Sequence, residues 1–308
     1  MSFKIPILIL SFNRPSLIKK QIDSLKELNP TSLYMYSDGP RNEIISDQKK
    51  VNKCRRIFHE NITWNCKTKY KFEKTNKGCG PGVSEAITWF FSNVEKGIII
   101  EDDCLLNKSF FPFAEEMLEI YENDFSIAGI TADYKLGASF TNNYGFIPFP
   151  LIWGWATWKR SWEDYSLNLE KFDKNNMPPI FSKMPRNQKK YWIKNFEKIS
   201  FEKRPHTWDY QFSYLVMSRN QKFIYPHTNL VSNLGFTKDA THTKNPYDKC
   251  SKLKTGEIFK PYQPDIKSDK YSNYLSKRVF INKSKLKKLL SYSKFFILNF
   301  IKSIKNYK

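Results

Sequence analysis

The sequence predicts an α/β protein with a mixed, mostly parallel sheet flanked by helices, and three observations support this. Apolar, β-rich runs alternate with helix-like segments through the first half of the chain. With 308 residues, 40% of them hydrophobic, the chain can bury the core of one large domain. Three of the predicted strands end in polar side chains, as expected where the loops of a parallel sheet bind a ligand.

The predicted elements follow from these runs in order. The first strand, at residues 5–12, is apolar from 5 to 10 and continues into Ser11-Phe12-Asn13-Arg14-Pro15. It is too short to span a bilayer and has no small-residue cleavage site, so we interpret it as a buried strand rather than a signal peptide. Further strands are predicted at residues 32–37, 69–73, 97–100 and 126–131, with helices at 16–28, 42–59, 82–93 and 108–123.

The second half of the chain is richer in aromatic residues and less regular. It contains an aromatic run at 151–158, a charged helix-like stretch at 186–199, and a helix predicted from Asp209 to Arg219. A polar segment at 246–275 is predicted to be a linker, so the compact domain is expected to cover residues 1–245. The tail then comprises residues 276–308.

The chain is strongly basic, with 51 Lys and Arg against 30 Asp and Glu and a net charge of +21. Residues 251–308 alone carry 15 basic and 3 acidic residues, a net +12. An anionic partner is therefore expected. Apolar residues at helical spacing and Lys over much of the rest predict a basic amphipathic helix at 284–305, suited to an anionic membrane surface. The alternative is a helix docked on its own domain or on a partner subunit.

Five cysteines, at positions 54, 66, 79, 104 and 250, form no C-x-x-C pair and are odd in number. They predict reduced thiols in a cytoplasmic protein, with neither a disulfide framework nor a zinc site.

The acidic triplet Glu101, Asp102 and Asp103 directly follows the strand at 97–100. Three like charges at the end of a buried strand are costly unless a cation lies against them. The next helix has better cap residues at 107–109, so the carboxylates are left for another task. Hard oxygen ligands suit Mg²⁺ or Mn²⁺, which bind through one or two carboxylates plus substrate phosphates. We therefore predict a metal and diphosphate site here.

Two further motifs have a structural alternative. The segment 76–82, which includes Asn76 and Gly78, lacks both the P-loop ending and the G-x-G-x-x-G spacing. It is either a loop whose backbone approaches a ligand or a plain turn before a helix. Asp209 is either a general base or a favourable negative charge at a helix N-terminus.

The aromatic and histidine candidates are equally open. Trp153 and Trp155, separated by Gly154, could form a platform for a sugar ring, or they could be core residues. His242 lies in a Gly/Thr-rich segment and is either a metal or phosphate contact or a surface residue.

Taken in order over residues 5–243, these motifs resemble the GT-A class of nucleotide-sugar glycosyltransferases, and most closely the inverting enzymes like N-acetylglucosaminyltransferase I. The resemblance is carried by the opening strand up to Arg14, Ser37-Asp38, Glu101-Asp102-Asp103 as the Glu-Asp-Asp form of the D-x-D motif, Gly154-Trp155, Trp208-Asp209 and His242. Each motif alone is weak, whereas the ordered set is fairly specific.

The resemblance implies a Rossmann-like GT-A catalytic domain with a nucleotide-binding half at 1–135 and an acceptor-binding half at 136–245. It implies transfer of GlcNAc or another hexose from a UDP-sugar to a hydroxyl of a glycan or lipid-linked oligosaccharide, with Mn²⁺ or Mg²⁺ as cofactor. Bacterial polysaccharide or lipooligosaccharide synthesis fits this chemistry. With the basic tail on an anionic membrane, the expected location is cytoplasmic and peripheral on the inner face of the membrane.

The resemblance also implies roles for individual residues. Asp103 and His242 would hold the metal, and Asp209 would be the base; Tyr210 stands where the family often has a second acid. The resemblance assigns contacts with the nucleotide to Arg14, Asp38, Glu101 and Asp102. We also predict nucleotide-sugar contacts from Ser11, Asn13, Asn76 and Gly78, and contacts to the acceptor or sugar from Trp153, Gly154, Trp155 and Trp208.

Two rival classes fit less well. A nucleic-acid-binding protein would suit the net charge, but the charge gathers in the tail and no nucleic-acid motif is present. We therefore expect no nucleic-acid partner. A sugar-phosphate nucleotidyltransferase would need a glycine-rich, basic loop after the first strand, where this chain has Ser11-Phe12-Asn13-Arg14-Pro15.

Overall fold

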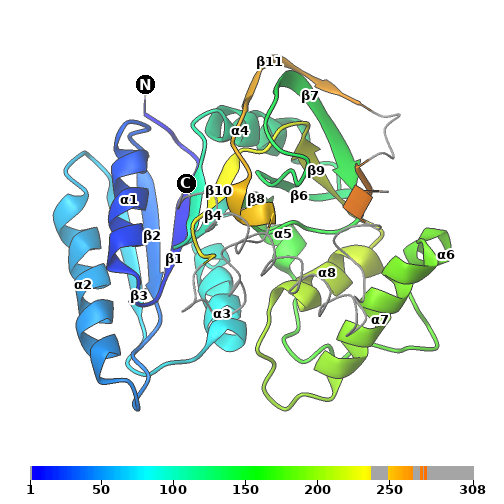
Figure 1. Ribbon diagram of the computed structural model, residues 1–308, viewed down its shortest axis with the longest axis horizontal. Coiled ribbons are helices and arrows are strands. Elements are labelled where there is room, and N and C mark those ends of the chain that lie inside the picture. The colour runs from blue at the N-terminus through cyan, green and yellow to red at the C-terminus, as the bar shows by residue number, and fades with distance from the viewer. Residues whose placement is uncertain (1, 237–248, 266–270, 273, 276–308) are drawn as a thin grey trace, which may run out of the picture.

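A computed structural model describes residues 2–236, 249–265, 271–272 and 274–275, and within them a nine-stranded sheet runs through the molecule with helices on both faces (Figure 1). The parallel pairs outnumber the antiparallel ones, so the predicted fold class is confirmed. In spatial order the strands are β11 (Glu257–Pro264), β7 (Phe140–Ile147), β9 (Lys222–Pro226), β6 (Ile127–Thr131), β8 (Trp155–Trp158), β4 (Lys96–Glu101), β1 (Ile7–Ser11), β2 (Ser32–Ser37) and β3 (Lys67–Phe72).

The strands and helices predicted for the first half are all present, with ends shifted by a few residues. The largest shifts at a helix start are three residues, in α2, which begins at Ile45 instead of residue 42, and in α3, which begins at Cys79 instead of residue 82. A short strand that was not predicted, β5 (Cys104–Leu106), pairs antiparallel with β10 (Val231–Asn233) just beyond the acidic triplet. The helices of this half are α1 (Pro15–Lys26), α2 (Ile45–Asn61), α3 (Cys79–Phe91) and α4 (Phe110–Ile120).

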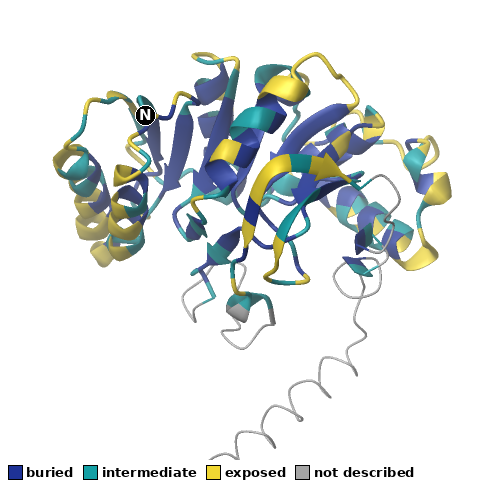
Figure 2. Ribbon diagram, turned by 90° about the horizontal axis from the view of Figure 1, so that it is seen from above, coloured by how far each residue is buried: buried dark blue, intermediate teal, exposed yellow. Residues whose placement is uncertain are grey.

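Side chains of β1 alternate between two hydrophobic clusters. Ile7 and Ile9 lie in the cluster that contains α1, α2 and α4, whereas Leu8 and Leu10 lie in the cluster on the opposite face. A strand buried on both faces is apolar at every position, as residues 5–10 are. Figure 2 shows the sheet buried and the outer sides of the helices exposed. The second cluster also contains residues of α3 and of α5 (Lys159–Trp162), α6 (Ile180–Lys183), α7 (Arg186–Ser200) and α8 (Asp209–Ser218).

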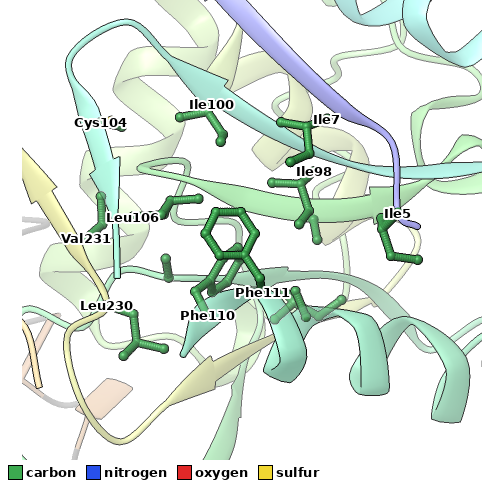
Figure 3. Close-up of a cluster of buried hydrophobic side chains, with 14 of the residues drawn as sticks. Ile5, Ile7, Ile98, Ile100, Cys104, Leu106, Phe110, Phe111, Leu230 and Val231 are labelled. Atoms are coloured by element: carbon green, nitrogen blue, oxygen red, sulfur yellow. The ribbon is translucent and has the colours of Figure 1, made fainter. Parts of the chain in front are cut away.

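The first cluster fixes the position of the β5–β10 sheet. Figure 3 shows Phe110 and Phe111, at the start of α4, beside Ile98 of β4 and close to Leu230 and Val231. All five side chains are at least nine-tenths buried. Because Val231 begins β10, this packing holds β10 and β5 against the carboxyl end of β4.

The expectation of a linker at 246–275 differs from the structure. Residues 257–264 form β11, which pairs in parallel with β7 at the edge of the central sheet. Beyond β11, Tyr271 and Leu275 are almost fully buried. The segment reads as polar because an edge strand with one solvent-facing side needs few apolar residues, and here Ile258 is the buried one. The predicted basic helix at 284–305 and the tail at 276–308 lie outside the described residues.

Among the residues that the structure describes, no helix combines the length and apolar character needed to cross a bilayer. The five cysteines are free thiols, as predicted. Cys54 and Cys104 are buried in the core.

Candidate functional site

A cavity of about 810 Å³ opens at the carboxyl ends of β1, β2 and β4. These three strands are adjacent and parallel, with Leu10 beside Glu101 and Ser11 beside Ser37, so their ends meet at one edge of the sheet. The cavity brings together most of the predicted site residues: Ser11, Asn13, Arg14, Asp38, Asn76, Gly78, Glu101, Asp102, Asp103, Trp153, Trp208 and Asp209.

Two carboxylates of the acidic triplet pair with Arg14. The Arg14 Nη1 lies 2.9 Å from Asp102 Oδ1 and 2.8 Å from Asp103 Oδ2. Burial raises the pKa of Asp102 to about 6, although Arg14 opposes the rise. Burial also raises the pKa of Glu101 well above its usual value, and the nearby charges of Asp103, Asp102 and Asp209 add to this effect. Full ionisation of the triplet therefore costs free energy even with Arg14 in place, and a further cation would lower that cost.

The turn that carries the triplet is held from two sides. The buried side chain of Gln21, in α1, donates hydrogen bonds to the carbonyls of Glu101 (2.5 Å) and Cys104 (3.0 Å). From the other side, the N–H of Leu234 donates to the Asp103 carbonyl at 2.7 Å. Gly235 follows so closely that a Cβ there would lie 2.0 Å from Asp103 Oδ2. A larger residue at 235 would therefore displace the Asp103 carboxylate from its present position.

Asp38 organises the loop at residues 76–78. Its Oδ1 accepts hydrogen bonds from the N–H of Lys77 and of Gly39, both at 2.8 Å, and its Oδ2 from Asn76 Nδ2 (2.9 Å) and the Gly78 N–H (3.0 Å). Burial raises the pKa of Asp38, and the backbone donors oppose this. Gly78 has a φ of +80°, which L side chains rarely adopt, immediately before α3 begins. The segment is therefore a built loop on the cavity wall.

The two tryptophans of the aromatic run have different places. Trp155, on β8, is fully buried and stacks on the nearly buried Trp208, with ring centroids 5.8 Å apart at 22°. Trp153 lines the cavity. The Lys135 Nζ lies 3.0 Å from the centroid of the Trp153 ring and 2.5 Å from the buried carboxylate of Asp133. The sugar platform stays a prediction for Trp153 and is wrong for Trp155, because β8 begins at Trp155 and its ring packs in the core against Trp208, Phe212 and Phe223.

Gly154 has a supporting place as well. It has a φ of +68°, and a Cβ there would lie 2.3 Å from Leu106 Cδ2. It does not line the cavity, so the prediction that it contacts sugar is corrected to a tight turn between Trp153 and β8.

Asp209 begins α8 and lines the same cavity as the triplet. Just before it, the Trp208 carbonyl accepts a hydrogen bond from the Tyr165 hydroxyl at 3.1 Å, which fixes the start of the helix. Tyr210 also lines the cavity, and its hydroxyl is 2.5 Å from that of Tyr191. His242, predicted as a metal contact, lies outside the described residues.

Sequence reasoning missed three residues of the site. Arg41 lines the cavity, and the fully buried Asp47 binds both Arg41 and Asn13. Gln21 holds the triplet turn as described above. The only signal in the sequence was the polarity of Gln21 and Asp47 at positions of α1 and α2 that face the core.

The chemistry of the cavity fits a divalent cation. Of the charged side chains that line it in the described structure, five are carboxylates (Asp38, Glu101, Asp102, Asp103 and Asp209) and two are arginines (Arg14 and Arg41). This excess is notable in a chain of net charge +21. Within the described ranges no cluster of three or more His, Cys, Asp or Glu side chains could enclose a metal. The carboxylate oxygens that line the cavity are hard donors, which Mg²⁺ and Mn²⁺ prefer, and these ions commonly bind through one or two carboxylates with phosphate oxygens as further ligands.

Comparisons with known proteins found similar folds only. No protein-family model and no curated protein matches the chain. Among solved structures, UDP-glucose pyrophosphorylase has 12% identity over 76% of this chain and 93% of its own, with a TM-score of 0.37. HddC from Yersinia pseudotuberculosis has 14% identity over 52% of this chain and 80% of its own, with a TM-score of 0.32. Mouse xyloside xylosyltransferase 1 has 11% identity over 71% of this chain and 84% of its own, with a TM-score of 0.36. At these TM-scores the similarities carry no inference about function.

Proposed function

We propose that the protein is a metal-dependent inverting glycosyltransferase that moves GlcNAc or another hexose from a UDP-sugar to a hydroxyl of a glycan or lipid-linked acceptor. One observation supports this most: the acidic triplet and Asp209 line the same cavity, although more than 100 residues separate them in the sequence. A metal-diphosphate site and a separate carboxylate base are the two parts that such a transfer needs.

The residues divide the work as follows. Asp103 would hold Mn²⁺ or Mg²⁺, which when bound supplies positive charge against the donor diphosphate. Arg14, already in contact with Asp102 and Asp103, would add a second positive charge near the leaving group. Trp153 lines the cavity and would offer one face of its ring to a sugar, while the Lys135 ammonium lies against the ring and holds it in place.

Asp209 would act as the general base. Its carboxylate takes the proton from the acceptor hydroxyl, whose oxygen forms a bond to the anomeric carbon. The bond from that carbon to the diphosphate oxygen breaks, and the nucleoside diphosphate leaves with the electron pair from the opposite face. The configuration at the anomeric carbon is therefore inverted.

A panel experiment tests this proposal. Thermal unfolding of the full chain is followed with UDP-, GDP-, CDP-, ADP- and dTDP-sugars, each with Mn²⁺, with Mg²⁺ or with EDTA. A ligand at about 100 times its Kd should stabilise the protein by about 2.7 kcal/mol. We expect a UDP-sugar to raise the Tm with a metal and not with EDTA. The absence of any metal-dependent shift across the panel would contradict the proposal.

A second assay, with a nucleoside triphosphate plus a sugar 1-phosphate in one sample and a sugar nucleotide alone in the other, distinguishes the second reaction class. A sugar-phosphate nucleotidyltransferase would release pyrophosphate from a nucleoside triphosphate and a sugar 1-phosphate, whereas a glycosyltransferase would slowly release nucleoside diphosphate from the sugar nucleotide alone. We expect only the second reaction. The loop after β1 supports this, since Ser11-Phe12-Asn13-Arg14-Pro15 leads directly into α1 without the glycine-rich segment that the first reaction requires.

The location and acceptor are part of the same proposal. A basic tail at 276–308 would hold the enzyme peripherally on the inner face of the cytoplasmic membrane, next to a lipid-linked glycan. Flotation of the full chain with vesicles of phosphatidylglycerol, compared with neutral vesicles, checks this. Equal recovery with both kinds of vesicle would argue against it.

A further inference from the structure

Asp47 is a buried carboxylate that the proposed reaction does not use. It lies in the first turn of α2, where an acidic residue stabilises the helix N-terminus, and its Oδ2 also accepts a hydrogen bond from the Arg41 N–H at 3.4 Å, ahead of the helix. Its side chain is fully buried and accepts hydrogen bonds from Arg41 Nε (2.6 Å), Arg41 Nη2 (3.1 Å) and Asn13 Nδ2 (2.7 Å). Asp47 therefore joins two residues of the cavity wall.

These contacts fix the orientation of the Asn13 amide. An ionised carboxylate only accepts hydrogen bonds, so the amide nitrogen of Asn13 must point at Asp47. The Arg41 guanidinium keeps the pKa of Asp47 below its usual value, against the effect of burial, and so keeps it ionised. The Asn13 Oδ1 then remains as an acceptor beside the cavity, since it has no hydrogen bond within the described part of the chain.

The Arg41 guanidinium is held in the same way. Two of its nitrogens bind Asp47, and its Cζ lies 5.3 Å from the centroid of the Phe12 ring. The Arg41 side chain is 45% exposed, whereas that of Asp47 is 1% exposed. The arginine is therefore held by a buried partner and remains accessible to a ligand. Phe12, Asn13 and Arg41 all line the cavity.

This combination suits a planar heterocyclic ring. Aromatic rings and guanidinium planes stack on nucleobases, and a fixed amide oxygen accepts a hydrogen bond from a ring N–H or an exocyclic amine. The carboxylates of the triplet, which would hold metal and diphosphate, lie next to this wall, because the Phe12 N–H faces Asp102 Oδ2 at 3.4 Å. A base and a diphosphate could therefore occupy neighbouring parts of the cavity.

We propose that Asp47 is a positioning residue for nucleobase recognition, which holds the Asn13 amide and the Arg41 guanidinium in the orientation that receives the base. This assignment rests on the proposed function, since it requires a nucleotide in the cavity. If Asp47 only connected α2 to the loop after β1, its substitution would change the affinity for all ligands alike. A positioning role for the base predicts that only ligands with a base lose affinity.

The test is calorimetric titration of the full chain with Mn²⁺ present. UDP, GDP, CDP, ADP and dTDP are first ranked on the wild-type chain, and the tightest is compared with inorganic pyrophosphate, which has no base. For Asp47→Asn we expect about tenfold weaker binding of the nucleotide and pyrophosphate binding within about twofold of wild type. Asp23→Asn is the matched control, because Asp23 pairs with Lys19 on the exposed side of α1 and should change neither value.

Arg41→Gln provides the second arm if Asp47→Asn does not fold, because Arg41 is half-exposed and the glutamine amide can still donate a hydrogen bond to Asp47. It should also weaken the nucleotide and spare pyrophosphate. Equal losses of affinity for the nucleotide and for pyrophosphate would show that Asp47 has only a structural role. Unchanged nucleotide binding in either variant would overturn the assignment. A wild-type chain that binds none of the five nucleotides would contradict the proposed function itself, and the role of Asp47 with it.

Discussion

Arg14 and Asp103 form a direct ion pair at the edge of the sheet, with the Arg14 Nη1 2.8 Å from Asp103 Oδ2. The same nitrogen also contacts Asp102. The carboxylate expected to bind the metal thus already has a positive partner, and a divalent cation would share it with the guanidinium. Because the carboxylates of Asp102 and Asp103 lie side by side, the site could hold the Arg14 guanidinium and a divalent cation at the same time.

Substitutions of Asp103 and Asp102 should weaken metal-dependent donor binding to different extents. Asp103→Asn is expected to weaken Mn²⁺-dependent binding of the donor by about 100-fold, since a neutral amide is a poor ligand for a hard cation. Asp102→Asn should cost less, about tenfold, because its role is on the nucleotide side. Titration of Mn²⁺ followed by electron paramagnetic resonance measures both. The reverse order of the two losses would move the metal to Asp102.

Asp209 should affect turnover and not donor binding. Asp209→Asn is expected to lower kcat by about 10²- to 10⁴-fold, the usual contribution of a general base, with donor affinity within about twofold of wild type. Steady-state kinetics and donor titration provide the two values. Asp164→Asn is the matched control, since Asp164 is exposed and pairs with Arg219 away from the cavity. Near-full transfer by Asp209→Asn would refute the mechanism.

Asp38 should be needed for the loop at 76–78. Asp38→Ala leaves the N–H groups of Gly39, Lys77 and Gly78 without their acceptor, which costs about 1–3 kcal/mol at the buried Gly39 and less at the partly exposed Lys77 and Gly78. We expect lower stability in urea together with faster hydrogen exchange at Lys77 and Gly78. Asn76→Ala, which removes one donor and leaves Asp38 in place, should be milder. Unchanged exchange in Asp38→Ala would show that the loop is held by other contacts.

Substitution of Trp155 should lower mainly the stability of the protein, and substitution of Trp153 mainly its activity. Trp155→Ala removes a fully buried ring and is expected to cost about 3–5 kcal/mol of unfolding free energy. Trp153→Ala should cost less than about 2 kcal/mol, because the ring is only partly buried, and it should impair transfer instead. Urea denaturation and an activity assay on both variants measure this. Equal stability losses would mean that both rings are core residues.

His227 gives the fold a pH dependence with a definite sign. Burial lowers the pKa of His227, and Asp265, 4.0 Å away, only partly offsets this. The unfolded chain therefore takes up a proton near pH 6.5 while the folded chain stays neutral to lower pH, so stability is lost as the pH falls below about 6.5. His227→Phe keeps a ring beside Tyr225 and Tyr134 and removes the proton uptake. Its Tm should fall less between pH 7.5 and pH 5.5 than that of wild type, and an equal fall in both would exclude His227 as the cause.

Much of the fold could be predicted from the sequence because fully buried parallel strands leave a simple pattern. The apolar runs that became β1 and β4 each end at a change to polar residues, and parallel pairing brings those ends together. Hence Arg14 and Asp103 could be placed in one crevice without any contact being known.

The parts that could not be predicted depend on pairing across the fold. Asp47 meets Asn13 over 34 positions and Gln21 meets Glu101 over 80, and nothing local in the sequence indicates which polar residues will turn inward. Likewise, Trp153 and Trp155 have equal claims from composition, and only the strand that begins at Trp155 decides which ring is buried. The edge strand β11 was missed because one solvent-exposed side makes it look like a loop.

That edge strand has a practical consequence for handling the protein. A chain shortened to the domain end expected from the sequence, at residue 245, would lack β11 and leave the backbone of β7 unpaired along one side. Phe140, on that strand, is already 78% exposed. An open edge of this kind is a template on which other molecules can add strands, so such a fragment should precipitate, whereas a chain that ends after Leu275 keeps β7 paired with β11, an edge strand that carries two prolines.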